Sequence, residues 1–594
     1  MEGFPTPGTL VFQTAAPNSF GAADMLYLLK GDAASEPVQS IIEAPGVAFP
    51  PPPAFSGDRE FTLQILHFND LHGRLVRFTP EGDQLIFSRL AWKLASSRKK
   101  CRNRADRAVL ALSAGDDCGG SVFDDLLVFE DHKNAVHPYY RLYSKLGIDA
   151  ACIGNHDLDY GVHFLAAAVS QEAKFPLLAA NITAPPEILE YLPPAALLVV
   201  KGVRIGVIGL VTRAETRLPC DCGEIVDPRP VAAALVKEMK PLCDVLIIAS
   251  HLGFCMETSK IPMADCGDAG LARSLPSGSV DLIIGGHSHT ILNQDGLEKQ
   301  NIINEIPVVQ AGANGEYIGE VELKLENGKS RIKSARLIPT SELQVDEGFE
   351  AQEVQPLMER AKALLTKVVG VVETDEDLST EEVRKGFASG ELALANYVSD
   401  ALYTRSVKQG LKVNFAMIDA SSIQQGFQAE ETLSYRDCFR MMPYADTIRI
   451  YQLTGGQLLE LLRENALRLS YPGEKQEERG FLQFSSQVRY TIEAGEGIRK
   501  ASVQKAAYQG VPLKEQSDHT FYAASTCFVR TLSLPWESGL EGSIKDRLIR
   551  LDDLPYQETE LQLRDEITAY IRHHGGITAE GGAVRDGRLQ IKNL

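Results

Sequence analysis

The chain has 594 residues, 44% of them hydrophobic, and a formal net charge of −19 at pH 7. This length predicts more than one domain, each with enough apolar residues to bury a core. The acidic balance argues against sequence-independent binding to nucleic acid, which needs a basic surface. No apolar run reaches the length of about 18 residues that a membrane span requires, so we expect none.

The cysteines and the first residues bear on the cellular compartment. Ten cysteines in a chain of 594 residues do not reach the density of a disulfide-bonded scaffold. The opening segment MEGFPTPGTLVFQTAAPNSF has no basic stretch before an apolar one, so we expect no signal peptide and a cytoplasmic location. Cys220, Cys222 and Cys266 are a candidate metal cluster, although scattered free thiols are the simpler explanation.

Residues 1–57 differ in composition from the rest of the chain. They end in APGVAFPPPPAF, a proline run that favours extended structure and is excluded from helix interiors and central strands. We expect an N-terminal extension with a proline-rich linker, either poorly ordered or lying as a strap across the next domain. The alternative is a docking segment for a partner protein, since LVFQTAAPNSFGAADMLYLLKG carries more apolar side chains than a simple tail needs.

Residues 58–345 alternate short apolar runs with helical patterns. Two stretches, FSRLAWKLASSRKK and HFLAAAVSQEA, have helical spacing. The apolar runs have the length and the β-branched content of buried strands, and they are FTLQILHF, AVLALSAG, ACIGNH, PLLAANI, RIGVIGLV, VLIIASH, DLIIGGH and PVVQAGA. Alternation of this kind predicts a layered α/β domain.

A connecting helix is predicted for residues 346–372, where GFEAQEVQPLMERAKALLTKV is amphipathic. Residues 373–594 form the second domain. It opens with the helical stretch GELALANYVSDALYTRSV and closes with the helical stretch LRDEITAYIRHHGG. The strand-like segments between them are VNFAMID, TIRIYQL, QVRYTIE and HTFYAAST. This order predicts an α+β domain.

Polar residues follow several predicted strands of the first domain directly. The carboxyl ends of parallel strands meet at one edge of a sheet, where α/β proteins usually place their sites. Carboxylate and imidazole groups are ordinary ligands of Zn²⁺, Mn²⁺ and Fe²⁺. The expected metal ligands are Asp70, His72, Asp116, Asn155, His251, His287 and His289.

Seven such groups are enough for two four-ligand shells that share Asp116. Two cations about 3.5–4 Å apart bind a phosphate and activate a water for in-line attack. His156, oriented by Asp159, suits the role of proton donor to the leaving oxygen. Each motif alone has a simpler explanation as a turn, a surface loop or a core histidine. Their joint occurrence after predicted strands favours the dinuclear site.

The motifs Asn-Asp-x-His, Gly-Asp, Gly-Asn-His-Asp, a strand-ending His and Gly-His-Ser-His occur here in that order. This order resembles the calcineurin-like metallophosphoesterases and, more narrowly, the 5′-nucleotidase family. The resemblance covers roughly residues 60–594. It implies a four-layer α/β/β/α domain, joined by a helix to a C-terminal substrate domain. It also implies His156 and Asp159 as a catalytic dyad.

The same resemblance implies a ligand set for each of the two metal ions. One ion would be held by Asp70, His72, Asp116 and His289. The other would be held by Asp116, Asn155, His251 and His287. The identity of the metals stays open, because mixed nitrogen and oxygen ligands suit Zn, Mn and Fe alike.

The second domain resembles the family less completely. The resemblance implies that Tyr444 and Phe528 stack on a substrate base, although simple packing between domains explains these aromatic residues as well. Family nucleotidases carry two arginines that bind the substrate phosphate, and Ser389 and Gln424 stand at those positions here. Their replacement removes two bidentate anion contacts, so the substrate is not identified by the sequence.

Two hypotheses of different classes follow. The first is a dinuclear-metal phosphoester hydrolase that uses metal-activated water on a small phosphorylated substrate, a nucleotide or a related metabolite. The second is a binding or scaffold subunit of a larger assembly, which retains the metal domain and docks through residues 1–57. The intact pair of His156 and Asp159 favours the enzyme. The lost arginines and the unusual N-terminal segment favour the scaffold.

Overall fold

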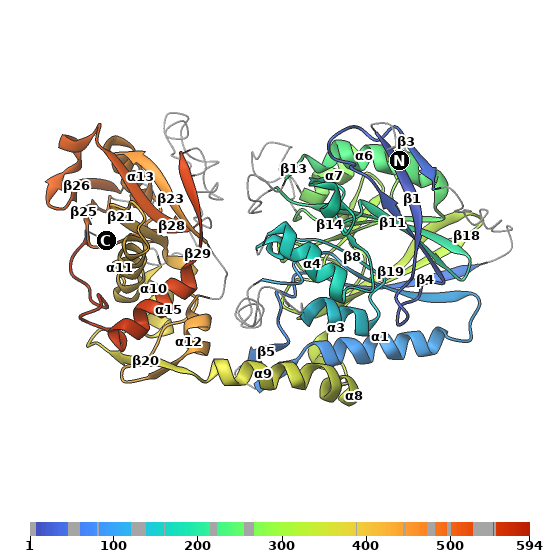
Figure 1. Cartoon of the computed structure of the whole chain (residues 1–594), viewed down its shortest axis with the longest axis horizontal. Coiled ribbons are helices and arrows are strands. Elements are labelled where there is room, and N and C mark those ends of the chain that lie inside the picture. Colours follow the sequence, from blue (N-terminus) through green and yellow to red (C-terminus); the bar gives the residue numbers. More distant parts are fainter. Residues whose placement is uncertain are drawn as a thin grey trace. The chain divides into compact units, whose positions relative to one another are not determined.

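The protein was analysed as a computed structural model, in which the chain forms two compact units, Met1–Ala361 and Lys362–Leu594 (Figure 1). The residues that the structure describes are 8–44, 60–79, 82–119, 138–159, 161–213, 223–254, 267–387, 389–442, 447–471, 481–495, 501–526, 551 and 554–593.

Two large sheets form the body of the first unit. Among the described residues, the larger sheet has nine strands in the order β16 (Ile302–Ile303), β17 (Ile306–Val309), β15 (Leu282–Gly285), β14 (Val245–His251), β12 (Val203–Val211), β11 (Ala195–Val200), β2 (Met25–Lys30), β1 (Thr9–Ala15) and β3 (Ser40–Glu43). The other has six strands in the order β19 (Lys329–Pro339), β18 (Tyr317–Glu326), β4 (Phe61–Phe68), β7 (Arg107–Ser113), β8 (Ala150–Cys152) and β9 (Leu177–Leu178).

Each sheet has a parallel centre with antiparallel strands beside it. Strands β12, β14, β15 and β17 run parallel in the larger sheet, and β4, β7, β8 and β9 run parallel in the smaller one. Every residue of β12 and β14 is buried. A strand that is covered on both faces has no polar side, which explains the unbroken apolar runs RIGVIGLV and VLIIAS.

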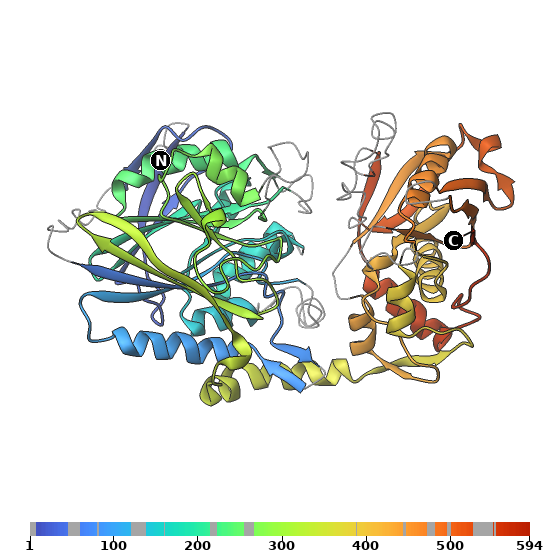
Figure 2. The same cartoon turned by 180° about the vertical axis from the view of Figure 1, so that it is seen from behind.

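Helices cover the outer face of both sheets. Helices α6 (Pro228–Met239) and α7 (Gly267–Ser274) pack on the larger sheet, and α1 (Phe87–Cys101), α3 (Pro138–Leu146) and α4 (Val162–Glu172) lie on the side of the smaller sheet (Figure 2). The inner faces of the sheets share a core that includes Leu63, Leu110, Val207, Ile247 and Ile284. The predicted α/β/β/α layering is therefore confirmed.

The N-terminal segment forms part of the larger sheet. Strand β2 pairs antiparallel with β11, placing Leu29 opposite Ala195, and β1 joins β2 to the edge strand β3. Phe12 and Leu29 are fully buried in the core under α6. The expectation of a poorly ordered terminus or surface strap is wrong for residues 9–43, because their apolar side chains extend the sheet. The proline run lies outside the described residues.

The connecting helix is interrupted by a wider turn. It begins with α8 (Glu347–Phe349), continues through a π-helical turn at Glu350–Val354 and ends as α9 (Gln355–Leu365). Strand β20 (Val368–Glu373) follows, so the predicted helix of residues 346–372 is too long at its C-terminal end. The run Val-Val-Gly-Val-Val favours a strand, since β-branched residues lose rotamer freedom in a helix.

The second unit is an α+β domain with three sheets in its described part. The strands in sheet order are β24 (Leu482–Phe484), β21 (Phe415–Asp419), β28 (Thr520–Thr526), β23 (Thr447–Thr454) and β29 (Tyr556–Gln562); then β27 (Val511–Pro512), β26 (Ser502–Tyr508), β25 (Val488–Glu493) and β31 (Leu589–Lys592); then β22 (Thr432–Ser434), β20 and β30 (Gly576–Thr578). The helices include α10 (Thr380–Gly386), α11 (Ala393–Lys408), α12 (Tyr435–Met441), α13 (Gly455–Leu467) and α15 (Leu563–His574). No helix among the described residues is long and apolar enough to cross a membrane.

We predict that Leu29→Ala lowers the free energy of unfolding of the first unit by about 2–5 kcal/mol, because it empties a fully buried site. Ile42→Ala on β3 is the control, since that side chain is 47% exposed. Urea unfolding followed by circular dichroism measures both. Equal unfolding midpoints for the two variants would show that the N-terminal strands contribute nothing to the core.

Candidate metal centre

The ligand-type side chains lie at the carboxyl ends of parallel strands from both sheets. The loops after β4 and β7 and after β8 come from the smaller sheet, and those at β14 and β15 come from the larger one. The seven residues at these strand ends are Asp70, His72, Asp116, Asn155, His251, His287 and His289. The structure therefore brings together all of the side chains that the sequence singles out as ligands.

Five of these seven residues have a left-handed backbone. Their φ angles are 51° at Asp70, 48° at His72, 51° at Asp116, 72° at His287 and 53° at His289. Residues other than glycine rarely adopt this conformation, which costs on the order of 1–3 kcal/mol each and is concentrated at functional sites. The left-handed conformation turns the chain where each strand ends, so that the ligand-type side chains converge.

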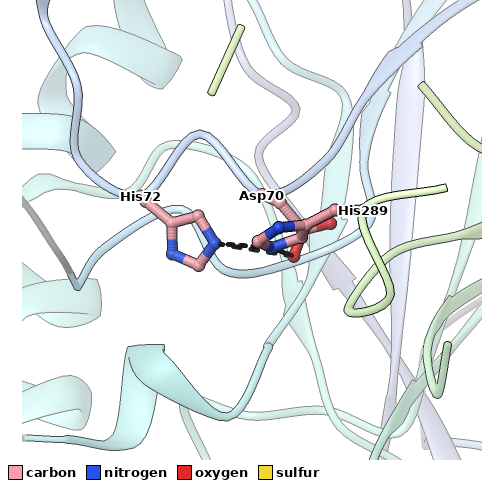
Figure 3. A group of neighbouring side chains, drawn as sticks. All are labelled: Asp70, His72 and His289. Carbon is pink, nitrogen blue, oxygen red and sulfur yellow. Dashed lines mark hydrogen bonds and ion pairs between the residues drawn. The ribbon is translucent and has the colours of Figure 1, made fainter. Parts of the chain in front are cut away.

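One group of donors consists of Asp70, His72 and His289 (Figure 3). The Nε2 atoms of His72 and His289 are 2.9 Å apart. Oδ1 of Asp70 lies 3.8 Å from Nε2 of His72 and 3.4 Å from Nε2 of His289. Two imidazole nitrogens and one carboxylate oxygen are thus directed at one point, which is the arrangement of three ligands around a cation.

A second group consists of Asp116, His251 and His287. Nδ1 of His251 lies 2.7 Å from the carbonyl oxygen of Ala114, and this contact directs its Nε2 toward Oδ2 of Asp116 at 3.0 Å. Oδ1 of Asn155 lies 3.0 Å from Nδ1 of His287, so the amide belongs to this group. Asp116 and His72 also occur together with His156 in a third group, which links the first two.

The protonation states of these residues, with the exception of His251, fit a divalent cation. Burial lowers the pKa of His72 to about 3 and that of His287 to about 4. Burial disfavours charge on Asp116, but His251, His156 and His72 together outweigh it and hold the pKa of that carboxyl well below its usual range. Burial likewise opposes charge on His251, yet Asp116 and Asp70 raise its pKa to about 10. Anionic carboxylates and neutral imidazoles are the forms that bind metal, so Asp116, His72 and His287 are ready to bind, whereas His251 must release a proton when a cation binds.

His156 lies beside the ligand groups with a carboxylate behind it. Its Nδ1 is 2.8 Å from Oδ2 of Asp159, and its backbone N–H donates to Oδ1 of Asp116 at 2.8 Å. The rings of His156 and His72 are 5.4 Å apart. Asp159 fixes the ring, because a bond at Nδ1 selects the orientation of the imidazole. The predicted pair is therefore assembled.

Sequence reasoning left Asp157 without a role, although it belongs to the quoted Asn-His-Asp motif. Its side chain is buried and accepts hydrogen bonds from the backbone N–H groups of Asp116 at 3.1 Å, Cys118 at 3.1 Å and Gly154 at 2.7 Å. It thus joins the loop after β7 to the loop after β8. The signal available in the sequence was the position of Asp157, a carboxylate directly after the predicted site residues Asn155 and His156.

Two motif glycines are needed for close approach. A Cβ atom on Gly154 would lie 2.1 Å from Oδ1 of Asp116, and one on Gly286 would lie 2.7 Å from Nδ1 of His251. Neither backbone can retreat without moving a ligand loop.

Asn69 was also missed: it donates to Oδ2 of Asp70 and to the carbonyl oxygen of Gly312, each at 2.6 Å.

The other residues singled out from the sequence fall into two groups. Tyr444, Phe528 and the three cysteines Cys220, Cys222 and Cys266 lie outside the described residues. Ser389 and Gln424 belong to the second unit and bond to their own surroundings. The Ser389 hydroxyl donates to the carbonyl oxygen of Lys385 at 2.7 Å, and the Gln424 amide donates to that of Ser421 at 2.6 Å.

Comparison with known proteins agrees with this geometry. Residues 63–290 match the family described as calcineurin-like phosphoesterase, and residues 368–529 match the 5′-nucleotidase C-terminal domain. A 5′-nucleotidase of Vibrio cholerae is 27% identical over 445 residues, which cover 70% of this chain and 78% of that protein. Protein UshA of Yersinia enterocolitica is 26% identical over 585 residues, which cover 91% of this chain and 95% of that protein.

A solved structure shares the fold. The 5′-nucleotidase precursor of Thermus thermophilus superposes with a TM-score of 0.58 at 22% identity, and the match covers 90% of this chain and 100% of that one. Both matched families occur in the order expected from the motifs, and the phosphoesterase match contains the seven ligand-type residues. The chain therefore belongs to the 5′-nucleotidase family, and it is a metal-dependent phosphoric ester hydrolase.

Proposed function

We propose that the chain hydrolyses a phosphoester bond of a nucleotide or a related phosphorylated metabolite with the help of two divalent metal ions. The convergence of seven donor side chains carries this proposal, since they form two groups that are linked by a third group of His72, Asp116 and His156. Asp70, His72, Asp116 and His289 hold one ion, and Asp116, Asn155, His251 and His287 hold the other. When bound, two such ions polarise the phosphate and supply a nucleophilic water.

His156 provides the proton for the leaving oxygen. Its Nδ1 is held by Asp159, so its Nε2 is the atom that donates. The carboxylate of Asp159 also stabilises the protonated imidazole that must be present before the transfer. The backbone bond from His156 to Asp116 keeps the donor next to the bridging ligand. The distance between the proton donor His156 and the ligand Asp116 is therefore fixed.

A nucleotide substrate is supported by the relatives, which are named 5′-nucleotidase and UshA. The second unit departs from them at the positions where family members carry phosphate-binding arginines. Ser389 and Gln424 are neutral and engaged with nearby carbonyl groups. We infer that this chain binds its substrate without those two arginine contacts, and that its preferred substrate differs from a simple nucleoside monophosphate.

The scaffold alternative loses its main structural argument for part of the N-terminal segment. Strands β1, β2 and β3 pair within the first unit, which explains their apolar side chains without a partner protein. Docking through the rest of residues 1–57 stays a prediction, and so does the cytoplasmic location. The intact pair of His156 and Asp159 supports the enzyme over a scaffold.

Removal of metal is expected to abolish hydrolysis of a generic aryl phosphate, because both the water and the phosphate depend on the cations. Addition of Mn²⁺ or Zn²⁺ to the chelated protein should restore it. Atomic emission should find about two ions per chain in the wild type and fewer in Asp116→Ala, which removes the shared ligand. Full activity in metal-free protein would contradict the proposed centre.

His156→Ala is expected to lower kcat by a factor of about 10²–10⁴, since it removes a general acid. Metal content should not change, because the imidazole is assigned to the leaving group. His163→Ala is the matched control, since that histidine is an exposed residue of α4. Wild-type kcat in the His156 variant, with metal retained, would reject the assigned role.

We expect AMP to be a poor substrate of the wild type in a panel with UDP-sugars and cyclic nucleotides. The double variant Ser389→Arg with Gln424→Arg should raise kcat/KM for AMP by about tenfold or more, because a hydrogen bond to a charged group contributes about 1.5–3 kcal/mol. Ser389→Met with Gln424→Met controls for side-chain length. Efficient hydrolysis of AMP by the wild type would show that the missing arginines do not govern specificity.

A further inference from the structure

Two of the ligand loops are joined to each other along their backbones. The N–H groups of Asp70, His72 and Gly73 donate to the carbonyl oxygens of Gly115, Asp116 and Asp117, each at 2.9 Å. Both loops contain left-handed residues, so neither holds its shape by local preference alone. The two loops therefore form one short hydrogen-bonded ladder, which needs contacts from other parts of the domain to keep its shape.

Helix α3 donates side-chain hydrogen bonds to both loops of this ladder. The hydroxyl of Tyr139 donates to the carbonyl oxygen of Gly73 at 2.6 Å, and the hydroxyl of Tyr143 donates to Oδ1 of Asp117 at 2.6 Å. The hydroxyl of Ser113 donates to the same carboxylate oxygen at 2.6 Å. Gly73 directly follows His72, and Asp117 directly follows Asp116, so each bond fixes a neighbour of a proposed ligand.

The two tyrosines are well placed to keep the loops in register. They stand four residues apart and therefore on one face of α3. Both side chains are fully buried. The ring of Tyr143 meets Phe68 edge-on at 5.3 Å, and the ring of Tyr139 stacks on Phe87 at 6.4 Å. The rings hold the hydroxyl groups in place, because buried aromatic side chains have few rotamers to exchange.

The helix is itself fixed at its far end by the N-terminal segment. The side-chain amide of Asn18 donates to the carbonyl oxygens of Ser144 and Ile148, each at 3.0 Å. Arg98 of α1 donates to the carbonyl oxygen of Gly147 at 2.6 Å and to Oδ2 of Asp149 at 2.8 Å. Helix α3 can fix the ligand loops only when the helix itself is held in place, and these hydrogen bonds hold its C-terminal end.

We propose that Tyr139 and Tyr143 are positioning residues for the metal centre, which fix the loops of His72 and Asp116 through hydrogen bonds to Gly73 and Asp117. This inference rests on the proposed function, since it presupposes that His72 and Asp116 are ligands. The tyrosines contact no reacting atom. They act by reducing the reorganisation that the two loops undergo when a cation binds.

The test compares Tyr143→Phe and the double variant Tyr139→Phe with Tyr143→Phe against the wild type, since Phe keeps the ring and loses only the hydroxyl. Loss of a supporting bond next to a ligand weakens metal binding by about 10–100-fold. We expect that change in the Mn²⁺ dissociation constant, measured by calorimetry on the chelated protein. The increase in Tm on addition of Mn²⁺ should shrink accordingly.

Tyr490→Phe is the matched control, because the hydroxyl of this buried tyrosine of the second unit accepts a hydrogen bond from Asn465 at 2.9 Å. A purely structural effect would lower the Tm of the metal-free and the Mn²⁺-loaded protein equally and leave the dissociation constant unchanged. That result, or equal Mn²⁺ affinity in Tyr143→Phe and Tyr490→Phe, overturns the proposal. If the double variant does not fold, Tyr143→Phe decides by the same two measurements.

The outcome for the wild type separates this inference from the proposed function. A wild type that binds no Mn²⁺ contradicts the metal centre itself. A wild type that binds Mn²⁺ with the same affinity as the tyrosine variants contradicts only the positioning role. In the expected case KM changes little at saturating Mn²⁺, because the substitutions alter occupancy of the metal site rather than contacts to the substrate.

Discussion

The architecture of the first unit depends on the position of one carboxylate. Asp116 follows β7 of the smaller sheet, yet its Oδ2 faces His251 at the end of β14 in the larger sheet, 3.0 Å away. Its Oδ1 accepts from the backbone of His156, and its own N–H donates to Asp157. A single buried anion thus contacts loops from both sheets. The two sheets must pack face to face in one register for these contacts to exist.

Such a site is costly in the absence of a cation. Buried carboxylates and left-handed residues each oppose folding, and they are tolerated only when the surrounding structure fixes them. Asp157 and the hydroxyl of Tyr143 supply part of that support with hydrogen bonds to the loop around Asp116. The charge of His251, whose pKa is raised to about 10 by Asp116 and Asp70 against the effect of burial, offsets some of the anionic charge.

The ligand set was predictable because strand ends and residue types are both legible in the sequence. The apolar runs before Asp70, Asp116 and His251 show where parallel strands end, and the fold places those ends together. The N-terminal strands were not predictable in the same way. Their apolar residues, such as Phe12 and Leu29, become meaningful only when the larger sheet offers an edge to pair with.

The support of the loops was also hidden from sequence reasoning. Tyr139 and Tyr143 have the spacing of ordinary core residues on a helix, and nothing in their sequence context shows that their hydroxyl groups reach the ligand loops. The left-handed backbone at five ligand positions is likewise a property of the folded state. Residue type predicts which groups can bind a metal, while their placement depends on long-range contacts.

The two units therefore carry different kinds of information. The first unit retains every ligand-type side chain and the pair of His156 and Asp159, which together define a reaction type. In the second unit, Gln424 donates to the carbonyl oxygen of Ser421, at a position where the sequence resemblance implies an arginine. Catalysis tolerates no loss of a ligand, whereas recognition can be rebuilt around a different substrate. Retained ligands together with replaced arginines are the ground for the proposed preference for a substrate other than a nucleoside monophosphate.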